Sequence, residues 1–276
     1  MERELKTRFH GLALRALSGV TLAMLSLAVI YVGGAIFELF VVLLGCLIAW
    51  EWGRLCNGGK FAVSGVGLLV LALLVVPLFK SLNIIDLSFF ALIAAFIIYL
   101  LARTTGEKAP GLLALGAFYI ILPLTSLLYL RVFFNGDICV YWLFALVWAT
   151  DIGAYFTGIL IGGPKLLPKI SPKKTWAGSL GGIAAAIGVT YGFAYYFPVR
   201  FLFANTELFT HMTGYAVLLS IVSQGGDLFI SAIKRRFGVK DTSQLIPGHG
   251  GVLDRVDGLI PAALAFMLIV LFALVS

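Results

Sequence analysis

Charged residues are scarce in this chain. Asp, Glu, Lys and Arg together make up 12% of its 276 residues, whereas hydrophobic residues make up 61%. A soluble domain carries about 25% charged residues, and the mean hydropathy of +1.05 points the same way. The apolar runs are long and continuous, whereas a transmembrane barrel has short alternating segments. The composition therefore excludes a soluble globular domain and predicts an all-α polytopic membrane protein.

Cysteine is equally scarce, and internal repeats and low-complexity linkers are absent. Cys46, Cys56 and Cys139 lack the spacing of metal ligands, so we interpret them as small buried hydrophobic residues. The net charge of +7 does not indicate nucleic acid. In a membrane protein it reflects cytoplasmic loops and attraction to anionic lipid heads or phosphate substrates.

Nine apolar segments are each long enough to be a candidate span. Gly, Asn and Pro residues separate several of them, as expected of turns. A basic stretch precedes the first segment and resembles a signal peptide, but the many later spans favour an uncleaved first helix. The predicted spans are about 12–32, 36–55, 61–80, 84–102, 111–131, 138–161, 177–198, 210–233 and 257–275.

Lys and Arg residues are distributed unevenly between alternate connections. With the N-terminus in the cytoplasm, 17 of the 20 fall on the inside and only Lys80, Arg131 and Arg200 fall outside. This asymmetry predicts a cytoplasmic N-terminus and nine transmembrane helices in the inner (plasma) membrane. Residues 1–135 would form a scaffold of five spans. Residues 136–276 would form the catalytic part, with four spans and two polar loops facing the cytoplasm.

Two aspartates lie inside predicted spans. Asp151 is in the sixth and Asp227 in the eighth, and each costs about 3 kcal/mol at the centre of a membrane helix unless it has a partner. A purely structural ion pair would satisfy this need. The glycines at 153, 158, 225 and 226 instead favour sites where another segment approaches closely.

The stretch 231–257, SAIKRRFGVKDTSQLIPGHGGVLDRVD, mixes charges of both signs beside a membrane span. Basic groups can hold phosphates, and carboxylates can hold the divalent ion of a nucleotide triphosphate. Asp254 and Asp257 are three apart at the start of the ninth span, so they are predicted to share a helix face. They either complement the helix dipole or join Asp227 around Mg²⁺. The charged residues are Lys234, Arg235, Arg236, Lys240, Asp241, Asp254, Arg255 and Asp257.

Two further segments carry phosphate-binding features. His249 is flanked by Gly248, Gly250 and Gly251, whose backbone N–H groups either cradle phosphate or simply form a turn. In the loop after the sixth span, Ser171-Pro-Lys-Lys-Thr175 places two ammonium groups between hydroxyls. This segment forms either a triphosphate clamp or a basic face on anionic lipid heads.

These residues resemble the signature of the phosphatidate cytidylyltransferase family, also called CDP-diacylglycerol synthases. A second block runs from Asp151-Ile-Gly-Ala-Tyr-Phe156 to Ser171–Thr175, and Glu51-Trp52 and 121–124 are also similar, so the resemblance spans most of the chain. Many members have Glu where this chain has Ala177, so that position is left out of the site. The signature is matched at Ser231, Lys234, Arg235, Lys240, Asp241, Ser243, Ile246, Pro247, His249, Gly250, Gly251, Val252, Asp254, Arg255 and Asp257.

The resemblance implies that CTP and phosphatidic acid give CDP-diacylglycerol and pyrophosphate, with Mg²⁺ alone or with a second cation, in a homodimer. The phosphate nucleophile is mostly ionised near pH 7, so no strong general base is needed. The expected catalytic residues are Asp227, Asp254, Lys234, Arg235, Lys240 and Arg255. The expected substrate-binding residues are Ser171, Lys173, Lys174, Thr175, Ser231, His249, Gly250, Gly251 and Asp151. The expected metal ligands are Asp227, Asp254 and Asp257.

Two other functions fit parts of this pattern. A different CTP-using lipid enzyme, such as a polyprenol kinase or an archaeal-lipid cytidylyltransferase, would share the phosphate and metal site. An ion-coupled transporter would explain the intramembrane Asp151 and Asp227. The absence of a repeat and the charge clustered on one side argue against a transporter.

Overall fold

The structure, a computed structural model, describes residues 2–133, 136–197, 211–248 and 250–275. Within these ranges the chain is almost entirely helical. The helices are α1 (Glu2–Val32), α2 (Gly34–Cys56), α3 (Val63–Ser81), α4 (Ile84–Thr104), α5 (Pro110–Val132), α6 (Gly136–Leu160), α7 (Trp176–Tyr196), α9 (Met212–Arg236), α10 (Leu253–Val256) and α11 (Leu259–Val275). The two strands are β1 (Lys165–Leu167) and β2 (Ser171–Thr175).

Each predicted span coincides with a long helix, which confirms an all-α membrane protein. Seven helices, α2 to α7 and α9, are long and apolar enough to cross a membrane. Shorter apolar stretches lie at Leu17–Val32 in α1 and Leu259–Ala273 in α11. The first helix begins at Glu2, ten residues before the predicted boundary. The number of crossings and the orientation of the N-terminus remain predictions.

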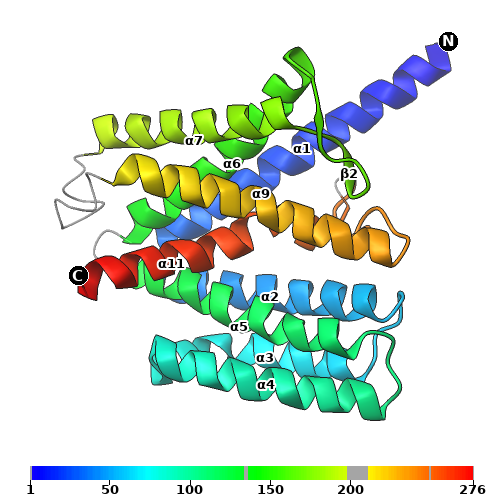
Figure 1. Cartoon of the computed structure of the whole chain (residues 1–276), viewed down its shortest axis with the longest axis vertical. Coiled ribbons are helices and arrows are strands. Elements are labelled where there is room, and N and C mark those ends of the chain that lie inside the picture. Colours follow the sequence, from blue (N-terminus) through cyan, green and yellow to red (C-terminus); the bar gives the residue numbers. More distant parts are fainter. Residues whose placement is uncertain (1, 134–135, 198–210, 249, 276) are drawn as a thin grey trace.

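The helices form two groups joined by the last one (Figure 1). Helices α2 to α5 lie together, α6, α7 and α9 form the second group, and α11 packs against both α5 and α9. Buried aromatic side chains, including Trp52 and Trp142, fill the interior. Helix α1 runs obliquely past the second group, and its N-terminal part projects beyond the other helices.

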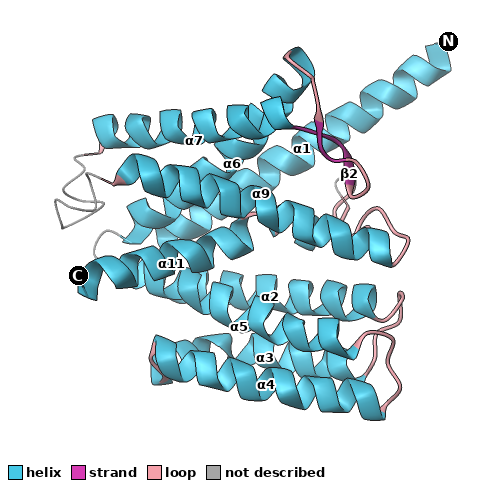
Figure 2. Ribbon diagram, in the orientation of Figure 1, coloured by secondary structure: helices cyan, strands magenta, loops and turns pink. Residues whose placement is uncertain are grey.

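Both polar connections lie at one end of the molecule (Figures 1 and 2). The start of α1 is at this end, whereas the C-terminal end of α11 is at the other. The connection after α6 was predicted as a loop, and it contains the antiparallel hairpin of β1 and β2, with Lys165 opposite Thr175. Thr175 then caps α7, since its Oγ1 accepts a hydrogen bond of 3.0 Å from the N–H of Gly178. The hairpin is therefore fixed directly to the start of a membrane helix.

Glycine residues allow α6 and α7 to pack closely, as predicted from Gly153 and Gly158. A Cβ atom added to Gly153 would lie 2.5 Å from the Cβ of Ala185. On the other helix, one added to Gly182 would lie 2.8 Å from the carbonyl oxygen of Thr150. Small residues commonly permit such contacts between membrane helices. This packing positions Asp151 of α6 next to the hairpin that precedes α7.

Candidate active site

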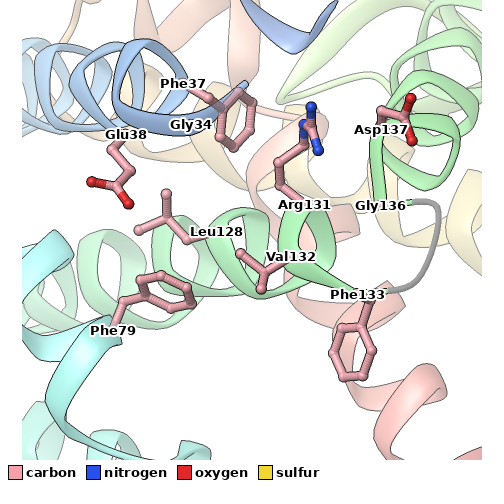
Figure 3. A pocket seen from close by; sticks show the side chains of 10 residues that line it. All are labelled: Gly34, Phe37, Glu38, Phe79, Leu128, Arg131, Val132, Phe133, Gly136 and Asp137. Atoms are coloured by element: carbon pink, nitrogen blue, oxygen red, sulfur yellow. The ribbon is translucent and has the colours of Figure 1, made fainter. Parts of the chain in front are cut away.

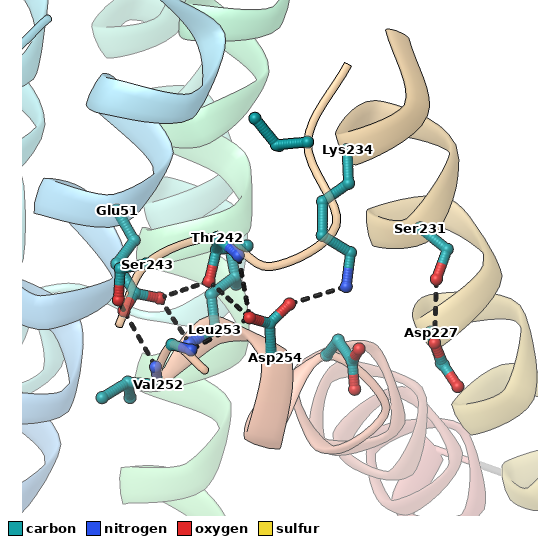
Figure 4. Close-up of polar contacts among 12 residues, drawn as sticks. Glu51, Asp227, Ser231, Lys234, Thr242, Ser243, Val252, Leu253 and Asp254 are labelled. Atoms are coloured by element: carbon teal, nitrogen blue, oxygen red, sulfur yellow. Dashed lines mark hydrogen bonds and ion pairs between the residues drawn. The ribbon is translucent and has the colours of Figure 1, made fainter. Parts of the chain in front are cut away.

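Asp227 of α9 is the meeting point of the two sequence blocks singled out above. Its Oδ2 lies 2.5 Å from the Nζ of Lys174 on β2, in an ion pair whose side chains are about one-third exposed. Its Oδ1 accepts a hydrogen bond of 3.2 Å from the hydroxyl of Ser231, one turn later on the same helix (Figure 4). The structure thus brings together three residues that the sequence predicted for substrate or metal binding.

Asp257 reaches the same place because residue 226 is a glycine. The carbonyl group of Asp257 packs on Gly226, and a side-chain carbon there would overlap it. Asp257 lies in the turn between α10 and α11, where its Oδ1 accepts a hydrogen bond of 2.9 Å from the N–H of Gly258. Asp257 lies within electrostatic range of Asp227, and the two negative charges repel each other. A cation at this point would relieve that repulsion.

Asp151 approaches this pair of aspartates from α6. Its side chain is exposed because it faces a cavity of about 680 Å³, which Arg255 also lines. Asp151 lies within electrostatic range of Asp227, Lys174 and Arg255. Lys234 in turn lies within range of Asp257. We call the set Asp151, Lys174, Asp227, Lys234, Arg255 and Asp257 the charged cluster.

Asp254 has a different set of partners from Asp227. Its carboxylate accepts hydrogen bonds from the Nζ of Lys234 at 2.6 Å, from the N–H and Oγ1 of Thr242 at 2.8 and 3.0 Å, and from the N–H of Gly251 at 3.0 Å (Figure 4). Burial alone would raise the pKa of Asp254. The hydrogen bonds from Lys234, Gly251 and Thr242 outweigh burial and lower it. A metal ion at Asp254 would have to compete with these donors.

The helix predicted to carry both Asp254 and Asp257 is interrupted. Helix α10 ends at Val256 and α11 begins at Leu259, so Asp254 lies in the short helix and Asp257 in the turn after it. The prediction of one continuous helix face bearing both carboxylates is therefore wrong. The interruption is where the chain packs against Gly226, and this contact brings Asp257 within electrostatic range of Asp227.

Glu51 of α2 is a structural part of the site to which the sequence analysis gave no role. It is fully buried, and its two oxygens accept hydrogen bonds from the N–H groups of Val252 and Leu253 at 2.9 and 2.7 Å. The hydroxyl of Ser243 donates to it at 2.6 Å, and the hydroxyl of Thr242, 3.0 Å from both carboxylates, shares its one proton between Glu51 and Asp254 (Figure 4). The available signal was a lone carboxylate within the apolar run GCLIAWEWG.

The glycine-rich turn has the predicted backbone shape but uses its N–H groups internally. Gly250 has a φ of +79°, which favours glycine. The N–H of Gly251 donates to Asp254, and the next two N–H groups donate to Glu51. They therefore bind carboxylates of the chain itself, which differs from the predicted phosphate cradle. His249 lies outside the described residues.

The other predicted residues take up separate positions. Arg235 donates to the carbonyl of Ile170 in the hairpin at 3.3 Å and to that of Val239 at 2.9 Å. Lys240 lines a different cavity of about 620 Å³, beside Trp50 and Arg54 of α2. Lys173 is exposed, and Ser171 and Thr175 are the two ends of β2. In the described part of the chain, neither Arg235 nor Lys240 pairs with Asp227 or Asp254.

Another cavity, of about 410 Å³, lies at the opposite end of α2 from Glu51 (Figure 3). It is lined by Gly34 and Phe37 at the start of α2 and by residues at the end of α5, with Glu38, Arg131 and Asp137 as its charged side chains. It contains none of the residues predicted for the active site.

The contact at Gly226 gives a direct test of how the charged cluster is assembled. Gly226→Ala is expected to push the Asp257 carbonyl away and lower enzymatic turnover by about tenfold or more, since a misplacement of about 1 Å can cost 10²-fold. The matched control is Gly225→Ala, where an added Cβ meets nothing within 4 Å. Turnover of both purified variants measures the difference. Equal activities would show that the close approach is dispensable.

The chain is similar in sequence to known proteins over most of its length. The model of the cytidylyltransferase family matches residues 13–273. The chain is 40% identical over 264 residues to the phosphatidate cytidylyltransferase of Brucella melitensis biotype 1, covering 92% of this chain and 91% of that protein. The protein of the same name from Brucella suis biovar 1 is 39% identical over 261 residues, with the same coverage. That from Haemophilus influenzae is 40% identical over 181 residues, covering 61% of this chain and 60% of that protein.

Proposed function

The chain belongs to the cytidylyltransferase family, and from this premise we propose that it is a phosphatidate cytidylyltransferase. It transfers the cytidylyl group of CTP to phosphatidic acid, giving CDP-diacylglycerol and pyrophosphate. The observation that carries the proposal is the meeting of Asp227 with Lys174 and Asp257, which draws both motif blocks into one charged cluster. The two Brucella relatives match 92% of this chain, so the similarity extends well beyond the residues of the charged cluster.

The reaction requires two anions to meet. A phosphate oxygen of the lipid attacks the α-phosphorus of CTP, a new P–O bond forms, and the bond from the α-phosphorus to the bridging oxygen breaks as pyrophosphate leaves. The lipid phosphate is largely ionised near pH 7, so no side chain has to remove a proton from it. Lys174, Lys234 and Arg255 are the cations of the charged cluster and would offset the negative charge that the two substrates bring together.

The carboxylates of the charged cluster fit Mg²⁺. Among the described residues no group of three or more His, Cys, Asp or Glu side chains forms a complete metal site. Mg²⁺, however, is usually bound by one or two carboxylates together with substrate phosphates and water. Asp227 and Asp257 would supply those carboxylates, and Asp254 would hold Lys234 in place beside them. When bound, the ion would neutralise charge developing on the leaving pyrophosphate.

We further propose that the charged cluster lies on the cytoplasmic side of the plasma membrane. Supporting this orientation, 17 of 20 Lys and Arg residues fall in connections predicted to be cytoplasmic. CTP would then arrive from the cytoplasm and phosphatidic acid from the bilayer. The assembly as a homodimer is proposed on the family resemblance alone.

The test is turnover by the purified protein in detergent, followed by pyrophosphate release and by detection of CDP-diacylglycerol. Release is expected only with CTP, phosphatidic acid and Mg²⁺ together, and EDTA should abolish it until Mg²⁺ is restored. Release with a polyprenyl or archaeal-type lipid phosphate only would keep the site and change the substrate. No release with any lipid phosphate would contradict the enzyme and favour a transporter.

A further inference from the structure

A largely apolar cavity of about 680 Å³ lies between α1, α2 and α6. Its volume is within the range of small-molecule pockets, which are typically about 300–1,000 Å³ and mostly lined by hydrophobic groups. It extends along the three helices from the level of Arg255 to residues well inside the predicted spans. The principal apolar residues that line it are Leu22, Leu25, Leu44, Leu47, Phe144 and Trp148.

One end of this cavity is polar and adjoins the charged cluster. Asp151 and Arg255 both line it, and Asp151 lies within range of Lys174 and Asp227. Ile246 and Val252 of the signature stretch also line the cavity. Helix α1 is attached to this stretch, since the hydroxyl of Ser18 donates a hydrogen bond of 3.3 Å to the carbonyl of Pro247. The cavity therefore connects the reactive groups with the apolar interior of the helix bundle.

The cavity is accessible from the side of the bundle. Three of the apolar residues that line it, Leu25 of α1, Leu43 of α2 and Ile152 of α6, are 51%, 54% and 57% exposed. All three helices carry predicted membrane spans, so these side chains would face hydrocarbon. An elongated apolar molecule could therefore enter from the bilayer without crossing water.

We propose that this cavity holds an acyl chain of the lipid substrate, with the lipid phosphate at Arg255. The proposal rests on the proposed function and identifies where its second substrate binds. Charge complementarity selects the occupant: the polar end of the cavity carries Arg255 beside the carboxylate of Asp151, which lies within range of Lys174, so an anionic head attached to an apolar chain finds a cationic partner next to an apolar cavity. A neutral or zwitterionic lipid would match the groove but leave the exposed Arg255 without its phosphomonoester partner.

The cavity would mainly position the lipid phosphate and would contribute less to the affinity for the lipid. Lipid tails are as apolar as leucine side chains, so moving a chain from the bilayer into the groove gains little hydrophobic free energy. The chain instead fixes the depth and direction of the phosphate relative to Asp227. Filling the groove would therefore exclude long chains by steric overlap and leave the charged cluster intact.

The variant Ala23→Trp tests this directly, because Ala23 of α1 lines the cavity. The measured quantity is the ratio of kcat/KM for dioleoyl phosphatidic acid to that for dihexanoyl phosphatidic acid, whose chains are too short to fill the groove. We expect this ratio to fall about tenfold or more, as for other pockets filled by extra atoms. The control is Met24→Trp, the next residue on α1, which is 63% exposed and outside the cavity. It should leave the ratio unchanged.

The outcomes separate the groove from the enzyme. If the wild-type protein makes no CDP-diacylglycerol, the proposed function fails. If the wild-type protein is active and Ala23→Trp leaves the ratio unchanged, the proposed groove is wrong. A similar fall in the ratio for Met24→Trp would also overturn it, since it would show a general effect of bulk on α1.

Photo-crosslinking of the wild-type protein keeps the proposal testable even if Ala23→Trp does not fold. Phosphatidic acid with a diazirine at the end of one acyl chain is expected to label peptides of α1, α2 or α6 that line the cavity. Unlabelled phosphatidic acid should suppress the labelling, and phosphatidylcholine should not. Equal suppression by phosphatidylcholine would mark a general membrane-lipid surface and contradict the proposal, as would labelling confined to other helices.

Discussion

Replacing Asp227 by Asn is expected to lower the turnover number by about 10² to 10³, the loss typical of removing one electrostatic group from an active site. The substitution keeps the shape of the side chain but removes the charge that pairs with Lys174 at 2.5 Å. It also removes one of the two carboxylates proposed to hold Mg²⁺. The measurement is Mg²⁺-dependent formation of CDP-diacylglycerol by the purified variant at saturating CTP.

The matched control for this change is Asp86→Asn. Asp86 is an exposed aspartate in the first turn of α4, where it accepts a hydrogen bond of 2.8 Å from Asn83, and it lies outside the charged cluster. Its replacement should leave turnover close to that of the wild type. If Asp227→Asn retained activity within a few-fold of wild type, the central role given to Asp227 would be wrong.

Replacing Glu51 by Ala is expected to destabilise the whole signature stretch. Three donors, from Ser243, Val252 and Leu253, converge on this buried carboxylate, and the Thr242 hydroxyl is shared between it and Asp254. Leaving buried donors unsatisfied costs about 1–3 kcal/mol each, so a loss of about 3 kcal/mol in the free energy of unfolding is a conservative expectation. For a chain of this size that corresponds to a fall in Tm of roughly 5–10 °C. Thermal unfolding in detergent, followed by intrinsic tryptophan fluorescence, measures it.

Glu38→Ala is the control on the same helix. Glu38 forms a surface ion pair with Lys80 at 2.7 Å, and the lysine side chain is 56% exposed. Surface pairs contribute below about 1 kcal/mol, so its Tm should remain near that of the wild type. Similar Tm values for the two variants would contradict the anchoring role of Glu51. Turnover should fall in Glu51→Ala as well, because Asp254 and Lys234 are held by the same stretch.

The helices could be predicted from the sequence because each span is encoded locally. An apolar run of about 20 residues can satisfy its backbone in a bilayer only as a helix, and Gly, Asn and Pro mark where it ends. The close approaches at Gly153 and Gly226 were also predictable, since a glycine beside an intramembrane aspartate leaves room for another segment. The short hairpin at 165–175 was missed because its strands are only three and five residues long and carry no run of alternating apolar residues.

The partners of individual carboxylates could not be predicted. Glu51 and its donors are separated by 191 to 202 residues, and no local pattern connects positions so far apart. The prediction that Asp254 and Asp257 share one helix face was wrong because of another distant contact. The helix breaks after Val256, where the chain packs against Gly226, and the two carboxylates have different partners. The signature predicted which residue types would form the site, but the tertiary packing decides which of them lie near Asp227.

The ion pair between Lys174 and Asp227 has a consequence for how the site is filled. In this structure Lys174 occupies the position next to Asp227 that a cation would take, and Asp227 occupies the position next to Lys174 that a phosphate would take. A phosphate that binds Lys174 would leave Asp227 without its ion-pair partner. A cation that binds Asp227 would leave Lys174 without its partner. If an anion binds together with its own cation, the anion pairs with Lys174 and the cation pairs with Asp227, so both residues keep a partner of opposite charge. If the charged cluster binds CTP as proposed, we expect the nucleotide to enter together with its metal ion, since a bare triphosphate or a free ion would leave one member of the Lys174–Asp227 pair without a partner.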